Sequence, residues 1–376
     1  MADAASLTLL TLPPDLLLCV LGLCSSNALR RCMATCRALR AEIKGAERLW
    51  QELLHGQLHS FPISPAVVHA VGYRRLLDTV EKDGIQVFQF GAGDPAAIEG
   101  TSDLYRVPGG FRSVRDVYVG GYFIALRTTT DTLVVIGHLN GHGFVHTFLT
   151  QVTDVRAGRN LIAVKRHGVW SVRFELMLSD AVPPNRHLLD VNVRHIEIGW
   201  QTALVVDDKG TMTLMSPSDT VTWNAENDFD LFGVGTQVIA ANRHGLYTSP
   251  MGPDPSWQSI MEFDPEEVPL KLRVWFQSVA LKTSKRWIVW LNNEFASPEE
   301  LPDDVCDVFL GDWHQGYITL SGQLFTWGNH CAGGNGHDAD MPRPCEVVPR
   351  DHIGPDRSVI GVVMGGWRTA IISVNT

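Results

Sequence analysis

Histidine and cysteine side chains gather near the C-terminus, where they could hold a metal ion. Five of them fall within one short stretch: His330, Cys331, His337, Cys345 and His352. Structural zinc sites draw their ligands in close pairs, usually two to four residues apart. Neighbouring members of this stretch have no such spacing. We therefore predict no metal site and no cofactor.

Motifs for covalent or phosphate chemistry are absent from the sequence. It contains neither the GxSxG turn of a serine nucleophile nor a glycine-rich phosphate loop. The seven cysteines include no CxxC pair, which would be typical of a zinc ribbon or a redox motif. Unpaired thiols are usual in reducing compartments. We predict a protein that is not an enzyme and that resides in the cytoplasm or nucleus.

Charge and hydropathy limit the classes of partner. The formal net charge of the 376 residues is -10, and an acidic surface repels phosphate backbones. The apolar run at 16–23 is far shorter than the ~20 residues needed to cross a bilayer. With 45% apolar and only 19% charged residues, the chain is expected to fold. We predict protein partners, with neither nucleic acid nor membrane among them.

The spacing of apolar residues along the sequence changes near residue 83. Up to residue 82 the apolar residues recur at helical spacing. Pro13 and Pro14 before Asp15 favour a helix start there. From Asp83 onward, short β-like runs alternate with glycine-containing turns. The sequence predicts a helical head followed by a β-rich body.

The body is built from a repeated phrase, of which GGWRTAIIS is the last copy. Seven copies recur at intervals of 36 to 40 residues, with 54 residues before the last copy, a period typical of repeat folds. They begin at Gly120, Gly158, Ile198, Gly235, Trp275, Gly311 and Gly365. The sixth position is always small: Ala125, Ala163, Ala203, Ala240, Ala280, Gly316 and Ala370. A small residue at one repeated position indicates strands packed closely face to face.

The repeats predict a mainly β fold, a seven-bladed β-propeller preceded by a small α-helical domain. Turns such as His167-Gly168 and Lys209-Gly210 lead from each phrase into a further strand. The last phrase has no such continuation, but the run Ile85–Phe90 could supply it. We predict that an N-terminal strand near 84–91 closes the ring, because an open ring would leave two unpaired edges.

One repeat carries a specific resemblance. GDWHQGYITLSGQLFTWGNHCAGGNG, at 311–336, resembles the repeat of the regulator-of-chromosome-condensation family. The matching positions are Gly311, His314, Gly322, Trp327, Gly328 and Asn329. The other repeats keep the first half of the pattern and shorten the loop. The resemblance implies guanine-nucleotide exchange or a chromatin or protein scaffold as one possible function.

The head carries a second resemblance. LPPDLLLCVLGLCSSNALRRCMATCRALRAEIKGAERLW resembles an F-box, which implies docking on the Skp-type adaptor of an SCF (cullin-based) ubiquitin ligase. The residues that this resemblance assigns to the adaptor are Leu12, Pro13, Leu16, Leu17, Val20 and Leu21. Packing of this apolar stripe on the propeller itself is the alternative. Gly22 departs from a good helix former and costs up to about 1 kcal/mol of helix stability.

The combined prediction is a non-catalytic substrate-recognition subunit, with the domains 1–54 (F-box), 55–82 (helical linker) and 83–376 (propeller). The alternative is an exchange factor or scaffold without a ligase role. Residues at and after the third position of the phrase could bind an unidentified protein substrate, since Trp, Tyr and Arg dominate interface hot spots. They are Tyr122, Trp200, Gln201, Trp313, His314, Trp367 and Arg368. Packing between blades is the alternative for any single tryptophan.

Overall fold

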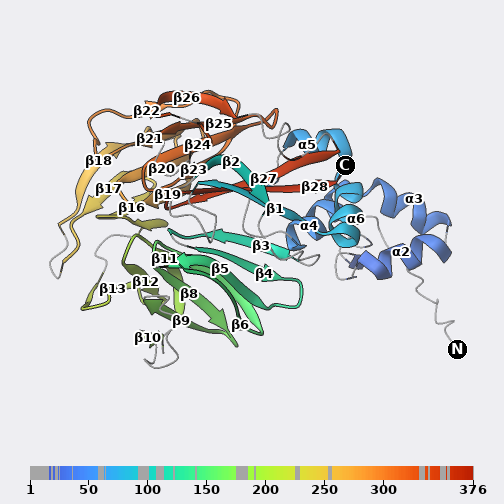
Figure 1. Cartoon of the computed structure of the whole chain (residues 1–376), viewed down its shortest axis with the longest axis horizontal. Coiled ribbons are helices and arrows are strands. Elements are labelled where there is room, and N and C mark those ends of the chain that lie inside the picture. The colour runs from blue at the N-terminus through green and yellow to red at the C-terminus, as the bar shows by residue number, and fades with distance from the viewer. Residues whose placement is uncertain are drawn as a thin grey trace, which may run out of the picture.

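The structure is a computed structural model of the chain. It describes residues 17, 20–21, 24, 26–35, 37–57, 63, 65–91, 101–106, 114–121, 123–139, 142–174, 185–189, 192–224, 229–252, 256–329, 335–337, 339–347, 353 and 356–375. Among them, the strands form seven four-stranded antiparallel sheets (Figure 1). The predicted seven-bladed propeller is confirmed.

The blades follow one another along the chain, and each is numbered here from the first complete one. Blade 1 contains β3 (Val114–Val119), β4 (Phe123–Thr128), β5 (Leu133–Leu139) and β6 (His142–Leu149). Blade 2 contains β7 (Val152–Ala157), β8 (Leu161–Arg166), β9 (Val169–Phe174) and β10 (Asn185–Leu188). Blade 3 contains β11 (Val193–Ile198), β12 (Ala203–Asp207), β13 (Thr211–Met215) and β14 (Thr220–Asn224).

The second half of the ring repeats the pattern. Blade 4 contains β15 (Leu231–Val234), β16 (Val238–Asn242), β17 (Gly245–Ser249) and β18 (Gln258–Glu262). Blade 5 contains β19 (Pro269–Trp275), β20 (Ser278–Thr283), β21 (Trp287–Trp290) and β22 (Glu299–Glu300). Blade 6 contains β23 (Val305–Leu310), β24 (His314–Thr319), β25 (Leu324–Gly328) and β26 (Met341–Val347).

Blade 7 is assembled from both ends of the propeller. It contains β27 (Arg357–Gly365) and β28 (Arg368–Asn375), followed in the sheet by β1 (Gln86–Gly91) and β2 (Thr101–Arg106). β1 pairs antiparallel with β28, from Gln86 opposite Ser373 to Gly91 opposite Arg368. The predicted closure is therefore confirmed, and β1 hides the edge that β28 would otherwise expose.

The first strand of each blade is the innermost one. Residues of β3, β7, β11, β19, β23 and β27 line one cavity of about 190 Å³. Because these strands belong to six different blades, the cavity is the central channel of the ring. The fourth strands lie at the other edge of each sheet, and in β14 they show the alternation of a solvent-facing strand.

The small residues at the sixth position of the phrase lie on the second strand of every blade. All six alanines of this column have no exposed surface, and Gly316 is buried as well. A Cβ atom on Gly316 would lie 2.6 Å from Cε of Met364 in the next blade. Facing blades thus approach so closely that a larger side chain would clash.

The innermost strands share a bulge. In every blade except blade 4, the described pairing of the first two strands skips one residue near the start of the first strand; the skipped residues are Arg115, Thr153, Arg194, Leu270, Cys306 and Ile360. A bulge re-aims the residue beside it. Asp307, directly after the bulge of blade 6, reaches Lys271 and Arg273 of blade 5.

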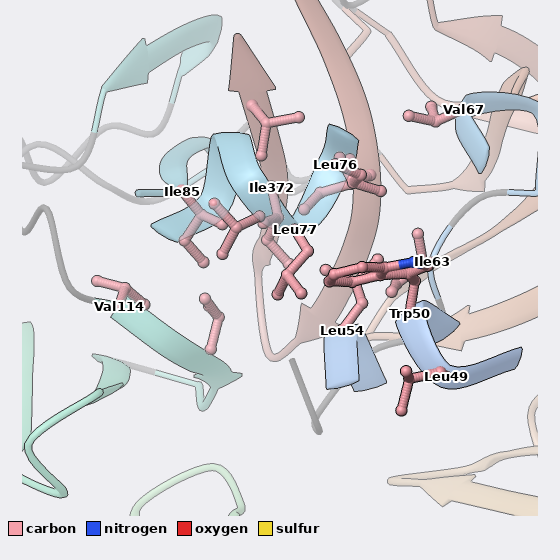
Figure 2. Close-up of a cluster of buried hydrophobic side chains, with 14 of the residues drawn as sticks. Leu49, Trp50, Leu54, Ile63, Val67, Leu76, Leu77, Ile85, Val114 and Ile372 are labelled. Carbon is pink, nitrogen blue, oxygen red and sulfur yellow. The ribbon is translucent and has the colours of Figure 1, made fainter. Parts of the chain in front are cut away.

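Helices α2 (Ser26–Thr35), α3 (Arg37–Gly45), α4 (Glu47–Gln57), α5 (Pro65–Val71) and α6 (Tyr73–Asp83) form the head. Leu76 and Leu77 of α6 are fully buried between Trp50 and Leu54 of α4 on one side and Ile372 of β28 on the other (Figure 2). Helices on both sides of the boundary predicted at residue 54 therefore share one core with the propeller. No described helix is long and apolar enough to span a membrane.

The propeller has two distinct faces. The turns between first and second strands lie on one of them, which we call the turn face. α6 ends at Asp83, and β1 starts opposite Ser373 near the far end of β28. The head consequently lies on the opposite face, which we call the head face (Figure 1).

Candidate protein-binding site

The turns of the turn face are tight, and those of blades 2 and 6 are alike. In blade 2 the Gly158 N–H donates to Leu161 O at 2.9 Å, and in blade 6 the Gly311 N–H donates to His314 O at 2.8 Å. Each turn therefore holds the second and third residues of its phrase above the end of the channel. These two positions decide what the face presents.

Arg159, the second residue of the blade 2 phrase, reaches across the ring. Its guanidinium carbon lies 4.3 Å from the ring centroid of Trp200 in blade 3 and 5.6 Å from that of Trp367 in blade 7. Its Nε atom lies 3.8 Å from Oδ2 of Asp312 in blade 6. Because blades 2 and 6 are not neighbours, Arg159 must extend over the channel axis.

Aromatic rings continue the cluster on the other side. Phe276 of blade 5 packs against Trp200 with centroids 4.9 Å apart, and against Trp313 of blade 6 at 5.3 Å and nearly perpendicular. Blade 4 lies between blades 3 and 5, and its turn offers only Gly235 and Thr236 at the first two positions. These small residues leave room for Trp200 and Phe276 to meet. We call Arg159, Trp200, Phe276, Asp312, Trp313 and Trp367 the turn-face cluster.

Asp312 places a carboxylate beneath these rings. It is buried, and its Oδ1 accepts a hydrogen bond of 2.6 Å from the indole Nε1 of Trp275. Burial raises the pKa of Asp312 above its ordinary value, while Trp275, Arg159 and Trp200 act in the opposite direction. The cluster thus combines a buried acid, an arginine and four aromatic rings, a set suited to binding a protein or a cation.

The structure brings three of the predicted substrate-binding residues together. Trp200 and Trp367 are half-buried, and Trp313 keeps 40% of its surface exposed. Gln201 is exposed beside Trp200. Tyr122 lies outside the described residues. The expected aromatic belt is therefore a compact cluster over the axis in the part of the chain that the structure describes.

Two of the predicted contact residues are interior residues, which corrects the sequence analysis. His314 is 1% exposed and Arg368 is 3% exposed. His314 Nε2 lies 3.0 Å from Oγ1 of Thr369 in the next blade. Burial lowers the pKa of His314 from 6.5 to about 4, against a smaller opposing effect of the Arg368 backbone. Both residues open a second strand, where successive side chains alternate in direction, so they point inward and join blades.

Arg159, Phe276 and Asp312 are members of the cluster that the sequence patterns did not predict. All three occupy the second position of the phrase, where the other described blades have Gly121, Gly199, Thr236 and Gly366. The change from glycine or threonine to arginine, phenylalanine and aspartate at this position is the sequence signal that could have indicated them. What each of them contacts depends on the geometry of the ring.

The predicted adaptor-binding residues divide into three groups. Leu12, Pro13 and Leu16 lie outside the described residues. Leu17 and Leu21 are 5% and 1% exposed and belong to the core that the head shares with the propeller. Val20 is 39% exposed. Packing on the protein itself thus accounts for Leu17 and Leu21, and of the described members only Val20 is available to a partner.

The histidine and cysteine stretch shows no metal-binding arrangement among the described residues. His337 and Cys345 are described, whereas His330, Cys331 and His352 lie outside that part of the chain. Asn335 explains the local structure of this loop. Its side-chain oxygen accepts a hydrogen bond from the His337 N–H at 3.0 Å, and its amide donates to Ala339 O at 2.9 Å.

Solved structures share the fold. Human WBSCR16 is 15% identical, covers 77% of this chain and 98% of its own, and superposes with a TM-score of 0.59. Prp20p from Saccharomyces cerevisiae, described with its binding to Gsp1p and histones, is 11% identical over 78% of this chain and 92% of its own, with a TM-score of 0.62. Yeast RCC1 (Prp20) in complex with Kap60 gives the same identity and TM-score over 78% and 89%. No family model and no curated protein sequence matches the chain. The chain therefore has the fold of a chromosome-condensation-regulator propeller.

Proposed function

We propose that this chain is a non-catalytic protein-binding scaffold whose turn face binds a protein partner. The turn-face cluster carries the proposal. Exposed tryptophan surrounded by further aromatic rings and an arginine is the composition of an interface hot spot. Trp313 in particular keeps 40% of its surface exposed, which a residue needed only for packing would not.

The fold is compatible with this role. Prp20p, which has the same fold, is described with its binding to Gsp1p and histones. At 11% identity this likeness concerns the fold alone. Gsp1p and histones are candidate partners that can be tested. A guanine-nucleotide exchange or chromatin scaffold role would use the same protein-binding face.

The test compares proteins captured from cells by the full chain and by two variants. Trp313→Ala removes the exposed ring of the turn face. Leu320→Ala is the matched control, because Leu320 is 51% exposed on the head face. We expect a partner that the parent and Leu320→Ala capture equally and that Trp313→Ala loses. Capture that is equal for all three proteins would contradict the proposal.

The second candidate function is the substrate-recognition subunit of an SCF-type ubiquitin ligase. The observation that favours it is the exposed Val20 between the buried Leu17 and Leu21. The head lies on the face opposite the turn-face cluster, so an adaptor and a protein target could bind together. In this scheme the Skp-type adaptor, and through it a cullin, contacts the head.

Co-purification with a Skp-type adaptor tests this second candidate. Val20→Asp adds a charge to the available contact without opening the core, in contrast to a charge at Leu21. Val20→Asp should abolish adaptor binding while the unfolding temperature changes little. No adaptor binding by the parent would exclude the ligase role, and unchanged binding by the variant would exclude Val20 as the contact.

A further inference from the structure

We propose that the turn face takes an arginine or lysine side chain of its protein partner into the turn-face cluster, in the place that Arg159 occupies in the isolated chain. This inference rests on the proposed function and specifies the chemistry of the partner. Arg159 would then fill the cation site in the free protein and rotate out of it when the partner binds.

The position of Arg159 shows that the cluster accepts a cation. Its guanidinium lies 4.3 Å from Trp200 and 5.6 Å from Trp367, both within the range in which aromatic faces attract cations. The carboxylate of Asp312 lies on the same side at 3.8 Å. Ring faces and a carboxylate are both complementary to positive charge, whereas an acidic side chain would meet them unfavourably.

The contact between Arg159 and Asp312 is longer than a charge-assisted hydrogen bond. Charge-assisted hydrogen bonds have lengths of about 2.7–2.9 Å, and the closest approach of this pair is 3.8 Å. Asp312 is only 6% exposed, so its charge depends on close partners in the protein. A cation of the partner that comes within hydrogen-bond distance of this carboxylate would therefore bind it more strongly than Arg159 does.

Displacement of Arg159 requires its side chain to leave the two tryptophan rings and the carboxylate of Asp312. The carbonyl oxygen of Arg159 accepts a hydrogen bond of 3.0 Å from the Gly121 N–H, which anchors the backbone of the turn. The backbone of the turn can stay in place while the side chain rotates. Exposed acids on the same face, Asp219 and Glu294, would attract a basic partner.

The experiment uses the full chain and a peptide with one arginine, acetyl-Gly-Gly-Arg-Gly-Gly-amide. Two control peptides replace the arginine with citrulline, which has the same shape without the charge, or with glutamate. Binding is followed by saturation-transfer NMR and by tryptophan fluorescence. We expect the arginine peptide to bind and both controls to bind at least about tenfold more weakly, as a cation–π site requires.

Three variants test whether Arg159 competes with the partner's cation or has a structural role alone. Arg159→Gln empties the site and should strengthen binding of the arginine peptide by about tenfold, because no internal competitor remains. Asp312→Asn keeps the acceptor for Trp275 and should weaken binding by about tenfold. Asp131→Asn, at a part-exposed acid on the head face, should change nothing. Circular dichroism checks the fold of each, and Trp200→Leu replaces Asp312→Asn if that variant unfolds.

Unchanged or weaker binding by Arg159→Gln would overturn the inference, as would equal binding of the citrulline peptide or tighter binding of the glutamate peptide. If this inference fails while the proposed function holds, the two variants differ in how they capture the cellular partner. The cellular partner would then still be lost with Trp313→Ala but kept with Asp312→Asn. Failure of the proposed function would leave its capture unchanged in both.

Discussion

The Nε atom of Arg159 in blade 2 lies 3.8 Å from Oδ2 of Asp312 in blade 6, across the axis of the ring. This ion pair joins two blades that share no edge, and it does so beneath aromatic side chains. The carboxylate is buried, and burial is the main cause of its raised pKa.

The raised pKa of Asp312 predicts a pH dependence of stability. Between the ordinary value of 3.8 and the raised one, the folded state binds more protons than the unfolded state. Asp312 therefore lowers the free energy of unfolding as the pH rises through this window. Asp312→Asn should lack that contribution, so its stability relative to the parent should increase from pH 4 to pH 7 in urea unfolding. A constant difference between the two proteins would contradict the assignment.

His314 predicts a contribution of opposite sign. Burial lowers its pKa from 6.5 to about 4, so between these values the unfolded state binds more protons. The stability that neutral His314 supplies is present above pH 6.5 and is lost as the pH falls towards 4, by roughly 3 kcal/mol. His314→Gln retains a polar contact to Thr369. The free energy of unfolding of this variant should depend less on pH across this range. Identical slopes for parent and variant would show that His314 is not the group responsible.

The shared blade predicts that a charge in β1 destabilises the whole ring. Val87 is 5% exposed and pairs with Ile372 of β28. Val87→Asp would bury an unpaired carboxylate and should cost about 3 kcal/mol or more of unfolding free energy. Thr220→Asp, at an exposed position of the outer strand β14, is the control and should cost little. Similar melting of both variants would contradict closure through β1.

Gly366 predicts a steric effect at the turn face. Its φ is 54°, and a Cβ atom there would lie 2.2 Å from Cα of Gly121 in blade 1. Gly366→Ala should therefore cost about 2 kcal/mol or more through strain and overpacking. Gly168 has a φ of 81° with nothing near its Cβ position, so Gly168→Ala should show only the backbone cost of about 1 kcal/mol. Equal losses in thermal unfolding would mean that the approach to Gly121 is not restrictive.

The sequence was sufficient to predict the fold because the fold is periodic. One alanine column and one turn pattern, repeated along the chain, indicated seven blades, and the incomplete last repeat indicated the strand that completes it. Periodicity carries no information about contacts between blades that are not neighbours. Arg159 meets Asp312 only because the ring is narrow enough for one side chain to cross it. Trp200 meets Phe276 across the small residues of blade 4.

The predicted contact residues differ in burial for a related reason. Trp313 and His314 are adjacent in the sequence, yet one is 40% exposed and the other 1%. The turn ends between them, and side-chain direction alternates once β24 begins. The position of that boundary distinguishes a residue that can contact a partner from one that joins blades, and a repeat alignment alone does not locate it.

The affinity of the captured partner for Trp313→Ala tests the central claim most directly. We expect a loss of about 2 kcal/mol in binding free energy, a typical hot-spot value, measured by calorimetry with the purified partner. The unfolding temperature should change little, because the ring is 40% exposed. Unchanged affinity together with a large fall in unfolding temperature would assign Trp313 to packing and contradict a partner site on the turn face.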